Sequence, residues 1–205
     1  MNNEQRMRAG LIYNPSAPDL AGRQQEALET LYDYNATRPS EGERRALLLT
    51  QMFATVGEGC YIEPPFHANW GGSHVHFGNH VYANFNLTLV DDGEIFVGDR
   101  VMFGPNVTIS TAGHPVLPEL RTRGAQFNLP VRIGNDVWIG AGALIMPGVT
   151  IGDNSVIGAG SVVTRDIPAD VVAFGSPCRV VREINEHDRK FYWRDREIDI
   201  SADQL

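Results

Sequence analysis

The feature that most constrains the fold is a six-residue repeat. From Ile133 the sequence divides into six consecutive hexads, IGNDVW, IGAGAL, IMPGVT, IGDNSV, IGAGSV and VTRDIP. The first position is always Ile or Val, the second is Gly in four of the six, and the fifth is Val, Ala, Ser or Ile. Neither a 3.6-residue helical face nor a simple alternating strand has this period. The repeat predicts a coil of short flat strands, in which three hexads close one triangular turn.

The same repeat continues upstream, with two irregularities. Phe77-Gly78, Ala83-Asn84, Val97-Gly98 and Phe103-Gly104 fit the template, and the register slips by two residues around the segment 91–94, DDGE. Ile109 and Ile133 both occupy first positions and lie 24 residues apart, which is a whole number of hexads. We therefore expect the coil to resume in register after a loop of about residues 111–131. Loops that interrupt a rigid repeat are common sites of function.

The segments on either side of the repeat have a different pattern. Residues 19–34 and 46–53 carry apolar side chains among charged ones, which predicts two helices that cover the open end of the coil. We divide the chain into an N-terminal helical segment, 1–57, the coil, 58–180, and a C-terminal helical tail, 181–205.

Composition excludes several classes of partner and location. The formal net charge is −8 and the pI about 5.2, which argues against nucleic acid or an anionic membrane as the main partner. No signal-peptide core and no long apolar stretch is present, so we expect a cytoplasmic protein. Cys60 and Cys178 lie far apart without ligand spacing, which favours free thiols over a disulfide.

One short stretch of the expected loop, STAGHPV, carries the first candidate for chemistry. Gly113 permits a sharp turn and Pro115 restricts the chain, so His114 between them projects away from the coil. An imidazole titrates near neutral pH and is suited to remove a proton from a hydroxyl group. A surface histidine in a turn fits the same pattern, and these residues alone leave both interpretations open.

A second histidine group raises the question of a metal. His74 and His76 would face the same side of a strand, but His80 is not in an obvious position for a third ligand. We therefore expect surface histidines and no metal site.

Longer strings resemble a known family. The hexads, together with EPPF, YANFNLTLVDD, GPNVTIS, TAGHPV and PCRVVREIN, are similar to the hexapeptide-repeat acyltransferases, and in particular to the galactoside and maltose O-acetyltransferases. The resemblance covers nearly the whole chain. It implies a mainly β fold, a left-handed parallel β-helix, and an acetyl-CoA-dependent O-acetyltransferase that works as a homotrimer with active sites between subunits.

The resemblance also implies a mechanism and an acceptor site. His114 would act as the general base, and the acceptor hydroxyl, expected to be the 6-hydroxyl of a galactoside, would attack acetyl-CoA directly in a ternary complex. Acceptor contacts would come from Asn69, Asn84 and Asp92. The family has Ser or Asp at the Asn69 position and an acidic residue within the stretch that here reads Asn14-Pro15-Ser16. From its residue type alone, Asn84 is equally a turn residue.

For the cofactor, the resemblance implies contacts with CoA from Ala141, Ala159, Thr164, Arg165, Arg179 and Arg182. The backbone N–H of Ala141, where the family commonly has Ser, would stabilise the oxyanion. Arg165 stands where the family usually has Lys, so a cation for phosphate is retained. Without the resemblance, the spacing of Arg179 and Arg182 is typical of the solvent-exposed face of a helix.

Two other functions remain open at the level of sequence. The acceptor could be maltose or glucose instead of a galactoside. The chain could also be a catalytically silent β-helix that serves as a scaffold, although a scaffold needs neither a Gly-His-Pro loop nor a cluster of arginines.

Overall fold

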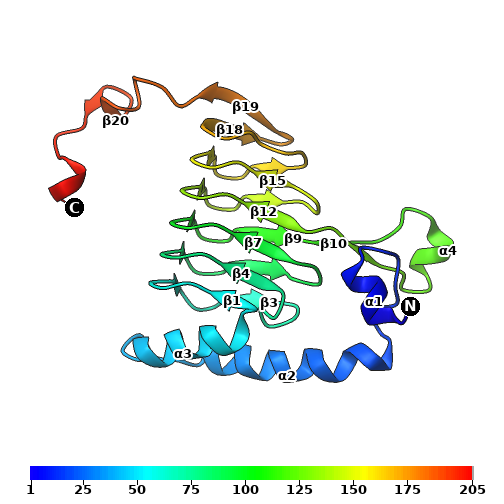
Figure 1. Cartoon of the computed structure of the whole chain (residues 1–205). Coiled ribbons are helices and arrows are strands. Elements are labelled where there is room, and N and C mark those ends of the chain that lie inside the picture. Colours follow the sequence, from blue (N-terminus) through cyan, green and yellow to red (C-terminus); the bar gives the residue numbers. More distant parts are fainter. Residues whose placement is uncertain (205) are drawn as a thin grey trace.

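The computed structural model describes residues 1–204, with the side chains of all of these except 19, 21 and 202. Three helices come first, α1 (Asn3–Arg8), α2 (Pro18–Asn35) and α3 (Gly42–Met52). A stack of short strands follows, and α2 and α3 lie across one end of this stack (Figure 1). No helix among residues 1–204 is long and apolar enough to cross a membrane.

The strands form three parallel sheets around one coil. The first sheet contains β1 (Thr55–Val56), β4 (Val75–Phe77), β7 (Ile95–Val97), β12 (Val131–Ile133) and β15 (Thr150–Ile151). The second contains β2 (Tyr61–Ile62), β5 (Tyr82–Ala83), β8 (Met102–Phe103), β13 (Trp138–Ile139), β16 (Val156–Ile157), β18 (Val171–Gly175) and β19 (Cys178–Glu183). The third contains β3 (His67–Ala68), β6 (Thr88–Val90), β9 (Thr108–Ser110), β14 (Leu144–Ile145) and β17 (Val162–Val163).

From β1 to β17, apart from β10 and β11, consecutive strands fall on the three sheets in turn, so three strands make one turn of the coil. Every neighbouring pair in these sheets is parallel except β18 and β19. The predicted left-handed parallel β-helix is confirmed.

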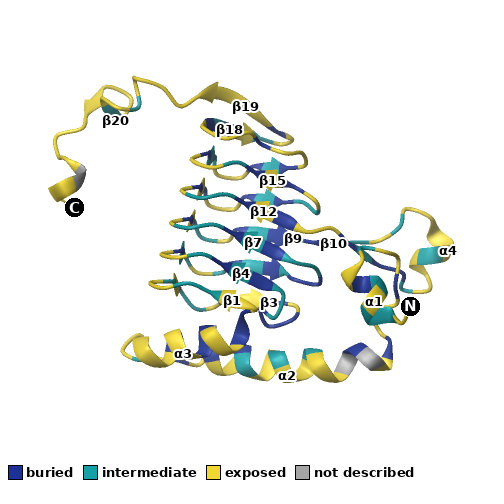
Figure 2. Ribbon diagram, in the orientation of Figure 1, coloured by how far each residue is buried: buried dark blue, intermediate teal, exposed yellow. Residues whose placement is uncertain are grey.

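The hexads build the core as expected. Their first positions are at most 4% exposed, namely Ile133, Ile139, Ile145, Ile151, Ile157 and Val163. Their fifth positions are also buried, and two of these are Ser155 and Ser161. The buried residues form a column through the centre of the coil (Figure 2). Each strand buries one first-position side chain, which explains why this position is apolar throughout the coil and Ile or Val in all six hexads from Ile133.

The glycines and the turns occupy different positions of the hexad. A Cβ on Gly140, a second position, would lie 2.6 Å from the backbone N of Ala159 in the next turn. The left-handed backbone falls at the fourth position, where φ is 57° at Asp136 and 61° at Asn154. Glycine at the second position therefore allows close stacking of the coil, while Gly, Asn or Asp at the fourth makes the turn.

A ladder of side-chain oxygens links successive turns at one corner. The backbone N of Asn79 donates to Asp99 Oδ1 at 2.7 Å, and the N of Asp99 donates to Asn135 Oδ1 at 2.8 Å. The N of Asn135 donates in the same way to Asp153 Oδ1 at 2.8 Å. These backbone groups point along the coil axis and have no strand partner, so the side chains satisfy them.

The N-terminal helices close the coil. Tyr34 Oη, from α2, donates to the carbonyl of Ile62 at 2.6 Å, and the amide of Asn35 pairs with both backbone groups of Phe66. Helices thus form over both predicted ranges and satisfy the exposed backbone of the first turn.

The helical tail expected at 181–205 is wrong. Residues 178–183 form β19, which pairs antiparallel with β18, and a second hairpin follows with β20 (Phe191–Trp193) and β21 (Arg196–Glu197). Among residues 181–204 the only helix is a short 3-10 helix, Ala202–Gln204, and residue 205 lies outside the described part of the chain. β18 leaves an open sheet edge at the end of the coil, and the β-branched residues Val180 and Val181 pair with it more readily than they would form a helix.

Candidate active site

The predicted base and two of the predicted acceptor contacts lie on one corner of the coil. This corner consists of the turns that lead from the third sheet to the first, and we call it the His114 corner. The slipped segment 91–94 and the loop 111–130 both belong to it, on consecutive turns. The backbone N of Asn69 donates to the carbonyl of Leu89, and the N of Thr111 donates to that of Val90. Stacking of the turns therefore brings the segments that carry Asn69, Asp92 and His114 together.

The loop that carries His114 is an ordered excursion. It contains β10 (Ala112–Gly113), the short helix α4 (Pro118–Arg121) and β11 (Phe127–Asn128), and β10 pairs antiparallel with β11. His114 is exposed, and its Nδ1 lies 2.8 Å from the carbonyl oxygen of Ala125. A carbonyl only accepts, so Nδ1 carries the proton and Nε2 of the neutral ring carries the lone pair. The structure thereby fixes the tautomer that a base requires.

Asp92 is only 6% exposed to solvent, and its carboxylate is held by side-chain amide groups. Its Oδ2 accepts from Asn69 Nδ2 at 2.9 Å and its Oδ1 from Gln126 Nε2 at 2.9 Å. Its backbone carbonyl accepts from Asn128 Nδ2 at 2.8 Å. Sequence reasoning found Asp92 and Asn69 but missed Gln126 and Asn128, because an amide in an irregular loop gives no periodic signal.

Tyr13 completes this group from the other end of the chain. Its backbone forms an isolated bridge with Gln126, and its hydroxyl accepts from Gln126 Nε2 at 2.6 Å. Burial raises the pKa of Tyr13 to about 12, so the hydroxyl keeps its proton. The adjacent Asn14 turns back on itself, since its Oδ1 accepts from the backbone N of Ser16.

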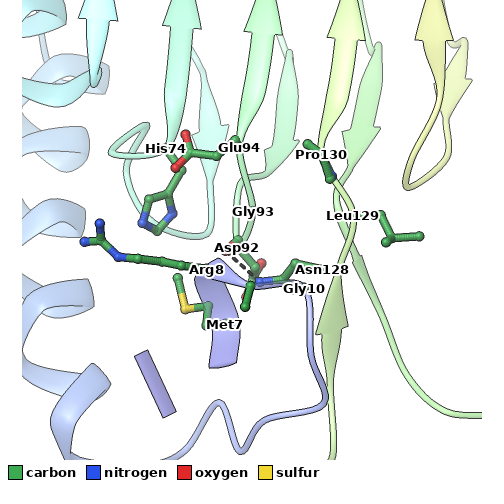
Figure 3. Close-up of a pocket in the computed structure, with 11 residues that line it drawn as sticks. Met7, Arg8, Gly10, His74, Asp92, Gly93, Glu94, Asn128, Leu129 and Pro130 are labelled. Atoms are coloured by element: carbon green, nitrogen blue, oxygen red, sulfur yellow. Dashed lines mark hydrogen bonds between the residues drawn. The ribbon is translucent and has the colours of Figure 1, made fainter. Parts of the chain in front are cut away.

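A pocket of about 260 Å³ lies beside Asp92, between α1 and the coil (Figure 3). Its lining is Met7, Arg8, Ala9, Gly10, His74, Asp92, Gly93, Glu94, Asn128, Leu129 and Pro130. The lining mixes donors and acceptors with a few apolar groups, which is the chemistry of a site for a polyhydroxylated ligand.

Asp91 has a different role from its neighbour. Its side chain is fully buried and accepts from the backbone N of Trp70 at 2.7 Å and of Gly72 at 2.9 Å. Burial raises the pKa of this carboxyl to about 6. Asp91 therefore fixes the turn that carries Asn69, while Asp92 lines the pocket.

A second corner carries Asn84, Ala141 and Ala159. It consists of the turns from the second sheet to the third, and we call it the Ala141 corner. The N of Gly160 donates to the carbonyl of Ala141 at 2.8 Å, so these turns stack directly. Asn84 Oδ1 accepts from the backbone N of Phe85, as a turn residue does. Within one chain the third sheet lies between the two corners, so Asn84 is not brought to Asp92.

The other predicted cofactor residues lie in two places. Thr164 and Arg165 are exposed on the His114 corner, in the turn that follows β17. Arg179 and Arg182 lie on β19, where Arg182 makes two hydrogen bonds to Asp188, of 2.6 and 2.8 Å. This pair lowers the pKa of Asp188 to about 2. Arg182 is thus engaged with a carboxylate, whereas the contact of Arg179 is with the neighbouring backbone carbonyl of Cys178.

His74 and His76 take part in local contacts. His76 Nε2 lies 2.7 Å from Glu94 Oε2, and His74 Nδ1 lies 2.7 Å from the carbonyl of Asp91. Within residues 1–204 no group of three His, Cys, Asp or Glu side chains is arranged to hold a metal ion. Cys60 and Cys178 are free thiols, and burial raises the pKa of both, which disfavours the nucleophilic thiolate.

The fold is a parallel β-helix built of hexads, and a histidine lies on a loop that leaves the coil. These two features define the class of protein as the hexapeptide-repeat transferases. Two family descriptions match, "Bacterial transferase hexapeptide (six repeats)" over residues 130–165 and "Maltose acetyltransferase hexapeptide capping motif" over 6–57. The second range contains α2 and α3, which close the coil, and the last residues of α1.

Individual relatives narrow this class. A galactoside O-acetyltransferase of Lactococcus lactis is 58% identical over 92% of this chain and 91% of its own length, and that of Escherichia coli is 50% identical over 97% of each. A solved galactoside acetyltransferase in complex with coenzyme A is 49% identical and superimposes with a TM-score of 0.94 over 98% of this chain and all of its own. A maltose O-acetyltransferase from Clostridium difficile is 41% identical, with a TM-score of 0.88 over 91% and 99%. The chain belongs to the galactoside O-acetyltransferase family, and the predicted class of acyltransferase is confirmed.

Proposed function

We propose that the protein transfers the acetyl group of acetyl-CoA to a hydroxyl group of a galactoside, expected to be the 6-hydroxyl. The observation that carries this proposal is the orientation of His114, whose Nδ1 is bound to the carbonyl of Ala125 so that Nε2 can accept a proton. The names of the relatives support the donor and the acceptor, because they include galactoside O-acetyltransferases and a complex with coenzyme A.

The proposed reaction needs no acyl-enzyme. Nε2 of His114 takes the proton of the acceptor hydroxyl while the hydroxyl oxygen forms a bond to the carbonyl carbon of the thioester. The tetrahedral intermediate then collapses, the C–S bond breaks, and the imidazolium returns its proton to the CoA thiolate. The products are the acetylated sugar and free CoA.

Acceptor binding is assigned to the pocket beside Asp92. The Asp92 carboxylate keeps lone pairs beyond those used by Asn69 and Gln126, and these accept hydrogen bonds from sugar hydroxyls. Asn69 uses its Nδ2 on Asp92, so its Oδ1 is the group left for the sugar.

Donor binding is assigned to the Ala141 corner together with cations from β19 and the turn after β17. Ala141 and Ala159 are exposed and small, which lets the pantetheine arm lie against the coil. Among the hydrogen bonds of residues 1–204, none is donated by the backbone N–H of Ala141, so this group is available for the oxyanion. Thr164, Arg165 and Arg179 are exposed at the edge of this donor site, where they can contact CoA. Arg182 would contact CoA as well once its hydrogen bonds to Asp188 break.

The positions of the two corners support a homotrimer. One chain presents the base on the His114 corner and the small residues on the Ala141 corner, with a sheet between them. A site that needs both is completed when the His114 corner of one chain faces the Ala141 corner of a second. The alternative acceptors are maltose and glucose, because a maltose O-acetyltransferase has the same fold and residues 6–57 match the maltose acetyltransferase capping motif.

The test is CoA release from acetyl-CoA with methyl β-D-galactopyranoside, maltose and glucose as acceptors. His114→Ala should lower kcat by a factor of about 10²–10⁴, the range of general-base catalysis, with the elution volume of the assembly unchanged. A larger kcat/KM for maltose or glucose would replace the galactoside as acceptor. Equal activity of His114→Ala would refute the mechanism, and no acceptor-dependent release from any sugar would favour a scaffold.

A further inference from the structure

The Asp92 carboxylate is held in its pocket by neutral groups. Asn69 Nδ2 and Gln126 Nε2 each donate to one carboxylate oxygen at 2.9 Å. Within residues 1–204 no cation forms an ion pair with Asp92. Amide donors orient a carboxylate without neutralising it, so Asp92 stays a strong acceptor whose direction depends on these two bonds.

Gln126 is fixed more firmly than Asn69. It is 7% exposed, whereas Asn69 is exposed, and the same Nε2 donates to Asp92 Oδ1 at 2.9 Å and to Tyr13 Oη at 2.6 Å. A carboxylate only accepts, so the amide nitrogen must be the atom that points to Asp92. Both protons of this nitrogen therefore have defined partners, and Gln126 has one preferred orientation.

The same short segment also holds the base. Ala125 accepts from His114 Nδ1 through its carbonyl, and Gln126, the next residue, donates to Asp92. In the register of β10 and β11, Gly113 lies opposite Phe127, so one step further places His114 opposite Gln126. The relative position of the base and the carboxylate is thus set through two consecutive residues.

We propose that Gln126 is a positioning residue that fixes the Asp92 carboxylate relative to His114, so that a sugar bound by Asp92 presents its reacting hydroxyl to Nε2. This role rests on the proposed function of the site. Gln126 acts through Asp92 and has no chemical role of its own. Its side chain helps to select the acceptor sugar and does not contribute to the binding of acetyl-CoA.

The test is Gln126→Leu, which keeps a similar volume and removes the donor. We expect KM for methyl β-D-galactopyranoside to rise about tenfold and kcat to fall about tenfold, because the sugar loses both a correctly directed acceptor and its alignment with Nε2, while KM for acetyl-CoA stays within about twofold of the wild type. The matched control is Tyr34→Phe, which loses the buried hydrogen bond to Ile62 at the capped end of the coil. The control should lower the thermal midpoint comparably and leave the galactoside KM unchanged.

A double-mutant cycle with Asp92→Ala distinguishes positioning from a general structural role. If Gln126 acts through Asp92, Gln126→Leu should change the galactoside KM less than twofold once Asp92 is replaced. Three outcomes would overturn the role of Gln126, provided that the wild type is active: additive effects in the cycle, an unchanged KM in Gln126→Leu, or an equal rise of KM in Tyr34→Phe. No acceptor-dependent turnover in the wild type would instead refute the proposed function, and the positioning role with it.

Discussion

Asp91 should make the protein less stable as the pH rises from about 4 to about 7. Burial raises the pKa of its carboxyl from 3.8 to about 6. Between these two values the folded chain keeps the proton, while the unfolded chain has already released it. Unfolding therefore releases a proton, and the free energy of unfolding falls as the pH rises through this window. The stabilisation is complete below pH 3.8 and is lost above the folded pKa.

The size of this effect follows from the two pKa values. At 1.36 kcal/mol per pKa unit, the interval from 3.8 to about 6 corresponds to about 3 kcal/mol. The assay is guanidinium unfolding at pH 4, 5, 6 and 7, at one protein concentration, for the wild type and Asp91→Asn. The variant has no carboxyl to titrate, and part of the full effect already falls below pH 4. The wild type should therefore lose about 2 kcal/mol more than the variant between pH 4 and pH 7.

Asp33→Asn, on the exposed face of α2, is the matched control and should keep the wild-type profile. The absolute stability of Asp91→Asn will be lower, because an amide cannot accept from both Trp70 and Gly72 in the way the carboxylate does. Only the slope with pH carries the prediction. A variant with the same slope as the wild type would refute the argument that the buried carboxyl holds its proton.

Two further predictions concern the coil. Ile139→Ala removes a fully buried side chain from the central column and should cost about 2–5 kcal/mol, measured by denaturant unfolding; a cost below about 1 kcal/mol would show that the core is not closely packed. Asn135→Ala removes the acceptor for the backbone N–H of Asp99 and should cost about 1 kcal/mol, with faster hydrogen exchange at that amide; an unchanged exchange rate would contradict the ladder.

The repeat made most of the fold predictable. An inward position every six residues is a strong signal because each strand of the coil needs one buried apolar residue, as Ile139 and Ile145 show. The register across the loop was also predictable, since β12 pairs with β7 and β15 as an uninterrupted coil requires. The C-terminal hairpin was not predictable in this way, because Val180 and Val181 form a strand only in the presence of the free edge of β18.

The site was predictable where a residue carries its own signal or lies in a string that resembles the family. His114 stood out between glycine and proline, whereas Asp92 was assigned through the resemblance of the segment that contains it. Gln126 and Tyr13 gave no signal, because their roles depend on long-range contacts. Gln126 contacts Asp92, 34 positions away in the sequence, and Tyr13 contacts Gln126, 113 positions away. Long-range contacts of this kind between irregular segments leave no periodic trace in a single sequence.

The excursion between β9 and β12 also has a consequence for how such enzymes diversify. Because the coil continues in register on both sides, the excursion behaves as a detachable module, and its length affects the closure entropy only logarithmically. New versions of this one segment could be exchanged without altering the core, and each would bring a different environment for the acceptor. The scaffold would conserve its stability while a single insertion explores new chemistry.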